Sequence, residues 1–342
     1  RPKSITSLGL IDIHFHGAFG IDLMSASSKD LTLLANKLAQ TGIAGFCPTT
    51  LSIPIGELLT SVARLGDWIV NTRQDPDFSG AFPLGIHLEG PFIAPHACGA
   101  HPVRSIRRFN RGELESLWKA SHRTIKIITL APEAISKKDI SWLLKWARVN
   151  KVLLSLGHSK ASHNDANYLF SHGFSGVTHA WNAMSFHHRD PGILGAALGR
   201  KNTYIELIVD GAHVSLEVID WTLKAHHPNP VCIISDCITS GGLSSQRWHS
   251  FGPLKVRNQG GAARLVGGGL AGGGKLLSKS YRDWVNNEAK RTQTSAEQVL
   301  RNSLKHVTSD PLKILGVKSR KFFKKNLIWK LKGDQCGKPC LK

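Results

Sequence analysis

Six histidine and acidic residues, spread along most of the chain, each come at or just after the end of a short apolar run. Imidazole and carboxylate are side chains that Zn²⁺, Fe²⁺ and similar divalent ions bind. The chain holds 17 histidines, so one histidine alone is a weak candidate, but six such side chains meeting in one place would form a metal site. We predict that site from His14, His16, Glu89, His158, His179 and Asp236.

Local sequence shows how these side chains are held. His14 and His16 are two positions apart, and residues i and i+2 of a strand share one face. Glu89 follows an apolar run and precedes Gly90-Pro91, where the proline forces a turn. A lone glutamate there would more often be an exposed loop residue. The repetition of the pattern at other predicted strands favours a ligand instead.

This set of side chains predicts hydrolytic chemistry. A divalent ion with an open coordination position binds water and makes it hydroxide near neutral pH. Asp236 follows a β-branched run and is a carboxylate that can take a proton and return it. The alternative is a structural aspartate at a strand end.

The elements that position these residues alternate between strand and helix eight times, which is the pattern of a (β/α)8 TIM barrel with its chemistry at the strand ends. The predicted strands are Leu8–Ile13, Ile43–Phe46, Leu84–His87, Thr124–Leu130, Val152–Leu156, Gly176–Thr178, Tyr204–Val209 and Val231–Ser235. Predicted helices include Asp30–Gln40, Ile55–Val70, Glu113–Ala120 and Ser215–Ala225. Two further helices are expected after capping motifs at Ser136-x-x-Asp139 and Ser162-x-x-Asp165.

The glycine-rich stretch from Gly267 to Gly274 partly matches two nucleotide motifs. The P-loop match fails at Leu276, where a hydroxyl is needed, and the dinucleotide match lacks the following strand of a βαβ unit. We expect a loop whose backbone approaches a ligand at the barrel mouth, or else a plain flexible loop.

Composition limits the remaining classes. The chain has 342 residues, of which 41% are hydrophobic, and no apolar run is long enough for a membrane span. No secretory signal is visible, and the six cysteines form no Cys-x-x-Cys pair. We expect a soluble cytoplasmic protein with reduced thiols.

The net charge of +20 would favour anionic partners, but much of it is local. One basic run holds Arg104, Arg107, Arg108 and Arg111, and it could face an anionic substrate or solvent. The other lies in 317–342, which we interpret as a basic tail or the remnant of a small β domain after a barrel domain at 1–316. Its last part, Lys332–Lys342, is expected to pack poorly.

Several motifs together carry a resemblance to a known family. They are Leu-Gly-Leu-Ile-Asp-Ile-His-Phe-His-Gly at 8–17, His-Leu-Glu-Gly-Pro-Phe at 87–92, Gly-Ala-His-Pro at 99–102, Gly-His-Ser at 157–159, Thr-His-Ala-Trp-Asn-Ala-Met at 178–184, Arg-Asp-Pro-Gly at 189–192, Asp-Gly-Ala-His at 210–213 and Ile-Ser-Asp at 234–236. In this order they resemble the N-acetylglucosamine-6-phosphate deacetylases of the amidohydrolase superfamily. The resemblance implies hydrolysis of N-acetylglucosamine 6-phosphate to glucosamine 6-phosphate and acetate.

The resemblance also implies roles for residues. Glu89, His158 and His179 would hold the main ion, His14 and His16 a second ion, and Asp236 would be the general base and then the acid. The substrate would be contacted by His101, Ala100, Asn182, Ala183, Arg189, His213, Leu270, Ala271 and Gly272. Family members are commonly homodimers. Their small accessory β-sandwich is expected to be reduced or absent here, because only Arg1–Ser7 precede the first strand.

Two other functions stay open at this stage. One is an amidohydrolase acting on a different amide, such as a cyclic amide or another N-acyl sugar. The other is a degraded, non-catalytic barrel that binds anionic partners through its basic surface. If the substrate is a phosphosugar, we expect neither nucleic acid nor a membrane as a partner.

Overall fold

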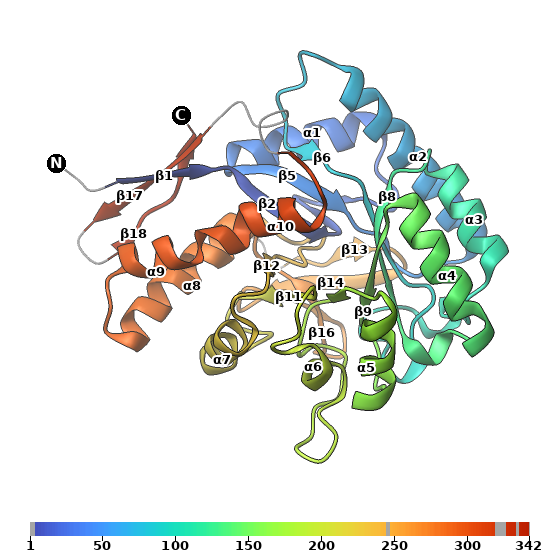
Figure 1. Ribbon diagram of the computed structural model, residues 1–342. Helices are drawn as coiled ribbons and strands as arrows, with labels where there is room; N and C mark the ends of the chain where they lie inside the picture. The colour runs from blue at the N-terminus through green and yellow to red at the C-terminus, as the bar shows by residue number, and fades with distance from the viewer. Residues whose placement is uncertain (1–3, 244–246, 319–325, 333–334, 342) are drawn as a thin grey trace.

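Eight parallel strands form a closed barrel at the centre of the computed structural model, which describes residues 4–243, 247–318, 326–332 and 335–341 (Figure 1). The third strand is interrupted and consists of two short segments. In barrel order the strands are β2 (Leu10–Phe15), β5 (Ile43–Pro48), β6 (Phe82–Pro83) with β7 (Ile86–Glu89), β8 (Ile125–Leu130), β9 (Leu153–Leu156), β10 (Gly176–Val177), β11 (Tyr204–Ile208) and β12 (Val231–Ile234). The predicted barrel is confirmed, with strand boundaries shifted by a few residues.

Parallel pairing runs from β2 through β6 and from β7 through β12. The ring closes at two points near the carboxyl ends of the strands. The Asp236 N–H donates to the carbonyl of His14 at 3.1 Å, and the Thr50 N–H donates to the carbonyl of His87 at 3.0 Å. Closure therefore brings the ends of all eight strands to one mouth.

Helices follow the strands and surround the barrel in Figure 1. They are α1 (Ser28–Gln40), α2 (Ile55–Gln74), α3 (Arg111–Ala120), α4 (Lys137–Asn150), α5 (His163–His172), α6 (Gly192–Ala197), α7 (Leu216–His226) and α8 (Leu277–Thr292), then α9 (Ala296–Ser303) and α10 (Ser309–Ile314). Short 3₁₀ turns are η1 (Pro95–Ala97), η2 (Val103–Ser105), η3 (Pro132–Ala134) and η4 (Leu304–Val307). Each longer helix buries one apolar stripe; in α1 the stripe is Leu31, Leu34, Ala35 and Leu38.

The two predicted helix caps have different outcomes. Ser162 caps α5 as predicted, because its hydroxyl accepts the N–H of Asp165. Ser136 is the N-cap residue of α4, which ends at Asn150 as predicted, but its side chain bonds to no backbone N–H, so the predicted capping box does not form. Its hydroxyl donates instead to the carboxylate of Asp139, which also pairs with Arg111 at 2.7 Å.

An antiparallel sheet is inserted between β12 and α8, and a two-stranded ribbon, β3 (Gly17–Ala18) with β4 (Ile21–Asp22), follows β2. The inserted strands are β13 (His249–Phe251), β14 (Leu254–Gln259), β15 (Ala262–Leu265) and β16 (Leu270–Gly273). The glycine-rich stretch thus ends in a strand rather than a flexible loop. The Gly273 N–H donates to the carbonyl of Asp236 at 2.7 Å, and a Cβ on Gly273 would lie 2.1 Å from the carbonyl oxygen of Ser235. Glycine is needed here because the two backbones approach so closely.

Segments from opposite ends of the chain form a second small sheet, seen beside the barrel in Figure 1. It contains β1 (Ser4–Leu8), β17 (Asn326–Lys332), β18 (Gln335–Cys336) and β19 (Cys340–Leu341). Trp329 is fully buried against the ring of Tyr281, and Asn286 bonds to both the N–H and the carbonyl of Cys336. The expectation that Lys332–Lys342 packs poorly is therefore wrong for Cys336, because α8 covers it. Residues 319–325, 333–334 and 342 of the predicted basic tail lie outside the described residues.

Within the part of the chain that the structure describes, no helix is both long and apolar enough to cross a membrane. The six cysteines are free thiols.

Candidate metal centre and active site

The six predicted chemistry-bearing residues lie together at the mouth of the barrel, although they come from five different strands. All of them are buried. His14 and His16 come from the end of β2, Glu89 ends β7, and His158, His179 and Asp236 follow β9, β10 and β12. The last three have positive φ angles of 48°, 30° and 48°, a strained backbone that is common at functional sites.

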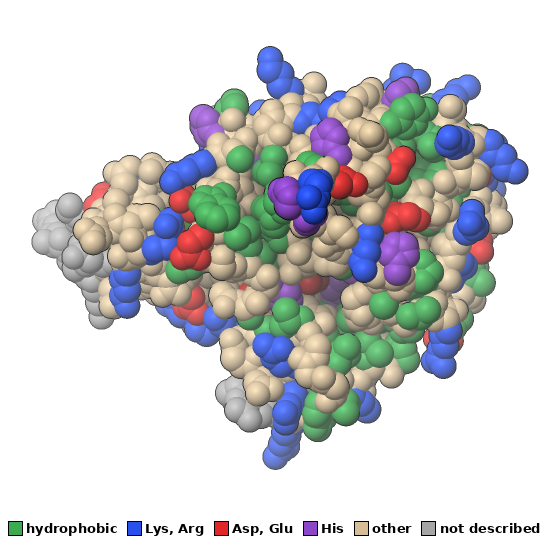
Figure 2. All heavy atoms as spheres, turned by 90° about the horizontal axis from the view of Figure 1, so that it is seen from below, with side chains coloured by type: hydrophobic (Ala, Val, Ile, Leu, Met, Phe, Trp, Pro, Cys, Tyr) green, Lys and Arg blue, Asp and Glu red, His purple; other side chains and the backbone are tan. Residues whose placement is uncertain are grey.

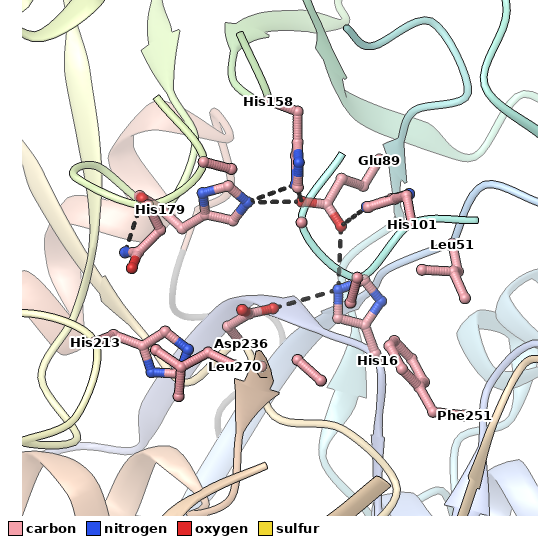
Figure 3. Close-up of a pocket in the computed structure, with 16 residues that line it drawn as sticks. His16, Leu51, Glu89, His101, His158, His179, His213, Asp236, Phe251 and Leu270 are labelled. Atoms are coloured by element: carbon pink, nitrogen blue, oxygen red, sulfur yellow. Dashed lines mark hydrogen bonds and ion pairs between the residues drawn. The ribbon is translucent and has the colours of Figure 1, made fainter. Parts of the chain in front are cut away.

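In one half of the cluster, three side chains direct potential ligand atoms at one another. Glu89 Oε1 lies 3.2 Å from His158 Nε2 and 3.0 Å from His179 Nε2, and the two imidazole nitrogens are 2.9 Å apart (Figure 3). His158 Nδ1 lies 2.8 Å from the Ala97 carbonyl, which can only accept, so Nδ1 carries the proton and Nε2 carries a lone pair. Three such groups at these distances fit a bound cation.

The other half of the cluster is built in the same way around the two histidines of β2. His14 Nε2 and His16 Nε2 are 3.2 Å apart, and both lie within 3.4 Å of Glu89 and Asp236. His14 Nδ1 lies 2.9 Å from the carboxylate of Glu206, so Nδ1 is the protonated nitrogen and Nε2 faces the cluster. The residues present therefore fit a second divalent ion, with Glu89 placed between the two positions.

Opposite charges in this buried cluster shift the pKa values of its members. Burial alone would lower the pKa of His14, but Glu89, Asp236 and Glu206 outweigh it and raise that pKa well above its ordinary value. Burial would raise the pKa of Asp236, but His14 and His16 lower it to about 2. The pKa of Glu89 is likewise held well below its usual range, against the effect of burial, by His14 and His101. Both carboxyl groups are thus ionised at neutral pH.

His101 presents a fixed hydrogen-bond donor to the cavity. Its Nδ1 accepts the backbone N–H of Ser52 at 3.0 Å, so the proton lies on Nε2, which points at Glu89 Oε2 from 3.2 Å. Burial lowers the pKa of His101 to about 4 although Glu89 opposes the shift, so the ring is neutral and can donate without a positive charge.

A cavity of about 200 Å³ opens onto this cluster, and it brings together most of the predicted substrate contacts. Lining residues from that prediction are Ala100, His101, Asn182, Ala183, His213, Leu270, Ala271 and Gly272. His213 is held by Asp210, whose carboxylate lies 2.8 Å from its Nδ1. Leu51 and Phe251 also line the cavity and were not predicted. Seen from below in Figure 2, acidic and histidine side chains lie in a recess near the middle of this face.

The described residues that line the cavity do not include Arg189. Its side chain is exposed, on a turn where His187 and Asp190 pair with each other. The basic run after His101 is also absent from the lining, and two of its members are held in ion pairs: Arg107 with Glu113 at 2.7 Å and Arg111 with Asp139.

Two buried acidic residues near the site were missed from the sequence. Glu206 lies in the middle of β11 and holds His14. Asp12 lies in β2, accepts both the hydroxyl and the N–H of Ser235, and has its pKa raised by burial to about 7. The signal was present in both cases, since a carboxylate inside an apolar strand is rare unless it has a partner.

The chain matches the sequence model of the amidohydrolase family over residues 5–254. The N-acetylgalactosamine-6-phosphate deacetylase of Escherichia coli O157:H7 is 31% identical over 318 residues, which cover 93% of this chain and 80% of that protein. The N-acetylglucosamine-6-phosphate deacetylase of Bacillus subtilis is 33% identical over 270 residues, which cover 79% of this chain and 67% of that protein.

Solved structures show the same relationship. The N-acetylglucosamine-6-phosphate deacetylase of Thermotoga maritima superposes with a TM-score of 0.79 at 27% identity, covering 98% of this chain and 89% of that chain. The Mycobacterium smegmatis enzyme of the same name has a TM-score of 0.85 at 21% identity, covering 97% and 85%, and supports the fold. The chain therefore belongs to the amidohydrolase family of metal-dependent hydrolases, in the group that contains the N-acetylglucosamine-6-phosphate deacetylases.

Proposed function

We propose that this chain hydrolyses the acetamide of N-acetylglucosamine 6-phosphate, giving glucosamine 6-phosphate and acetate in amino-sugar catabolism. The observation that carries the proposal is the meeting of His16, Glu89, His158, His179 and Asp236 at one small cavity, with His14 in contact with His16. The names of the relatives supply the substrate class.

The ions in this proposal are Zn²⁺ or Fe²⁺. Glu89, His158 and His179 hold the main ion, and His14 with His16 hold a second one. When bound, such an ion polarises the acetyl carbonyl and lowers the pKa of water, so that hydroxide is available near neutral pH.

The remaining steps belong to side chains of the chain. Asp236, ionised because its pKa is about 2, accepts a proton from the attacking water and then gives it to the leaving amine. The Nε2–H of His101 donates to the acetyl oxygen as negative charge develops there. Water adds to the carbonyl carbon and the C–N bond breaks. The proton that Asp236 takes from water ends on the leaving amine.

The sugar and its phosphate need their own contacts. Trp181 and Ala183 have positive φ angles of 76° and 51°, a backbone of the kind that forms anion-binding nests, and we assign the phosphate to Asn182 and Ala183. Arg189 supplies positive charge from its exposed turn. His213, held by Asp210, contacts the sugar, and Ala100 with Leu270, Ala271 and Gly272 line its position.

Three further assignments complete the proposal. The free thiols support a reducing, cytoplasmic location. A division into a barrel domain at 1–316 and a small C-terminal unit at 317–342 is proposed from the sequence; the sheet of that unit also takes in β1 from the start of the chain, through its pairing with β17. A homodimer is proposed from the family resemblance.

N-acetylgalactosamine 6-phosphate is a second candidate substrate, because the Escherichia coli relative bears that name. A cyclic amide is included in the test below as a comparison substrate. On the face drawn in Figure 2, lysine and arginine side chains are scattered rather than gathered in one stripe, so this face does not favour binding of nucleic acid.

The test is steady-state hydrolysis by the Zn²⁺- or Fe²⁺-loaded protein. The substrates are N-acetylglucosamine 6-phosphate, the same sugar without phosphate, N-acetylgalactosamine 6-phosphate and a cyclic amide. The proposal expects the highest kcat/KM for the first and a large loss without phosphate. A preference for the galactosamine epimer, or for a cyclic amide, would replace the proposed substrate.

A further inference from the structure

We propose that Glu206 is a positioning residue that creates the second ion position by orienting His14. The inference rests on the metal site of the proposed function but not on its substrate. Glu206 lies in β11 and has no exposed surface. It lines no part of the cavity that the structure describes, so its role is exerted through other residues.

One carboxylate oxygen of Glu206 reaches both halves of the metal centre. Its Oε2 accepts the Nδ1–H of His14 at 2.9 Å and the backbone N–H of His179 at 3.3 Å. A carboxylate bonded to Nδ1 fixes the tautomer of an imidazole, so that the Nε2 lone pair is free, and it raises the basicity of that nitrogen. Because His14 is fully buried, the ring has little freedom to reorient once this bond is made.

The neighbouring His87 does not compensate the charge of Glu206. Its Nδ1 donates to the Ile13 carbonyl at 3.0 Å and lies 4.0 Å from Glu206, and its Nε2 lies 2.7 Å from the Thr129 hydroxyl. Both ring nitrogens therefore have partners, and His14, His87 and Glu206 do not form an open third ion site although their ligand atoms lie close together. His14, with any cation bound to it, is the group that makes burial of this carboxylate tolerable.

A purely structural role predicts something different. Loss of a purely structural carboxylate would weaken both ion positions together, whereas loss of a positioning carboxylate weakens only the ion that its histidine holds. Replacing Glu206 with leucine removes its bond to His14 and should therefore act on the ion that His14 holds. The same change should remove one ion and leave the ion at Glu89, His158 and His179.

The experiment measures ions per chain by elemental analysis after loading with Zn²⁺ and dialysis, and dissociation constants by titration. We expect two ions in the parent and one in Glu206→Leu, with the second ion bound about 10–100-fold more weakly in Glu206→Gln. Glu288→Gln is the matched control, because Glu288 is a buried carboxylate paired with Arg291 in α8. It should keep both ions.

Three results would overturn the inference: two tightly bound ions in Glu206→Leu, loss of both ions together, or a parent chain that binds only one. Cobalt absorption spectra, which report on the ligands of each ion, provide an independent reading. None of these measurements uses a substrate. A chain with the expected ion loss but no deacetylase activity would thus keep this inference and reject the proposed function.

Discussion

At the scale of single residues, the site separates its ionisable groups by environment. Asp236 and Glu89 are held ionised by the histidines around them, while His101 and His87 are held neutral, each with a pKa of about 4, chiefly by burial. Below the metal centre the Nε2 of His87 continues into a chain of hydroxyls from Thr129, Thr178 and Ser155, with links of 2.7, 2.6 and 2.7 Å. The barrel interior is thus polar where it supports the ligands.

Replacing Asp236 with asparagine tests the proton carrier. The amide keeps the shape of the side chain but cannot accept a proton, so kcat should fall by about 10²–10⁴-fold, the range typical of acid–base catalysis. The acidic limb of the pH–rate profile should disappear. Metal content, measured on the same samples, should be largely retained. Near-normal turnover with unchanged metal content would show that another group carries the proton.

The Asp210–His213 pair gives a pH-dependent contribution to stability. Burial would raise the pKa of Asp210, but His213 and backbone N–H groups lower it below 3.8, so its contribution is lost as the pH falls through that lowered value. Burial would lower the pKa of His213, but Asp210 raises it above 6.5, so its contribution is lost as the pH rises through that raised value. The pair therefore stabilises the fold most at pH values between 3.8 and 6.5.

Asp210→Asn should lower the free energy of unfolding by about 1.5–3 kcal/mol in that window, as expected for a hydrogen bond to a charged group. The difference from the parent should shrink on both sides of it. Denaturant unfolding of both proteins in chelator, at three pH values, measures this. A difference that stays constant with pH would mean that the pair is not ionised in the folded chain.

At the scale of elements, the site depends on how the inserted sheet meets the barrel. β16 lies along the end of β12, where Gly273 bonds to Asp236 and Cys237 forms a parallel bridge to Gly273. The same strand carries Leu270, Ala271 and Gly272 to the cavity. The inserted sheet therefore supports the proposed base and lines the cavity at once.

Gly273→Ala should disturb this contact. Its Cβ would lie 2.1 Å from the carbonyl oxygen of Ser235, a backbone atom that cannot move without shifting Asp236. We expect both a lower melting temperature and a lower kcat. Gly267→Ala is the matched control, because a Cβ there meets no atom within 4 Å. Equal behaviour of the two variants would contradict the proposed contact.

At the scale of the whole molecule, the metal centre joins distant parts of the chain. The five candidate ligands come from four strands, so an ion bound only by the folded state stabilises the barrel as a whole. The potential ligand atoms of Glu89, His158 and His179 lie 2.9–3.2 Å apart, so that one cation could contact all three.

Chelation should therefore lower the melting temperature and abolish hydrolysis, and added Zn²⁺ or Fe²⁺ should restore both. The stabilisation should grow with free metal concentration, by about 2.7 kcal/mol at one hundred times the dissociation constant. Differential scanning calorimetry with paired activity assays measures this. Full activity in protein shown by elemental analysis to be metal-free would reject metal dependence.

Local sequence determined much of this protein. The alternation of apolar runs with helical segments predicted the barrel, because the two periodicities are set by neighbouring residues alone. The closure of the barrel then made the six predicted residues converge, since parallel strands place their carboxyl ends at one mouth. The convergence of six residues could thus be predicted from the sequence: His14, His16, Glu89, His158, His179 and Asp236.

Tertiary structure decided what depends on contacts between distant residues. In the sequence, Glu206 is only one residue of a mostly apolar strand. In the folded chain its carboxylate lies 2.9 Å from His14, which is 192 positions away. The Ser136 motif predicted a cap, but Arg111 from another helix holds Asp139, whose carboxylate takes the serine hydroxyl. β17 pairs with β1 from the other end of the chain, which local charge could not show. In each case the deciding partner is far away in sequence, and only packing brings it near.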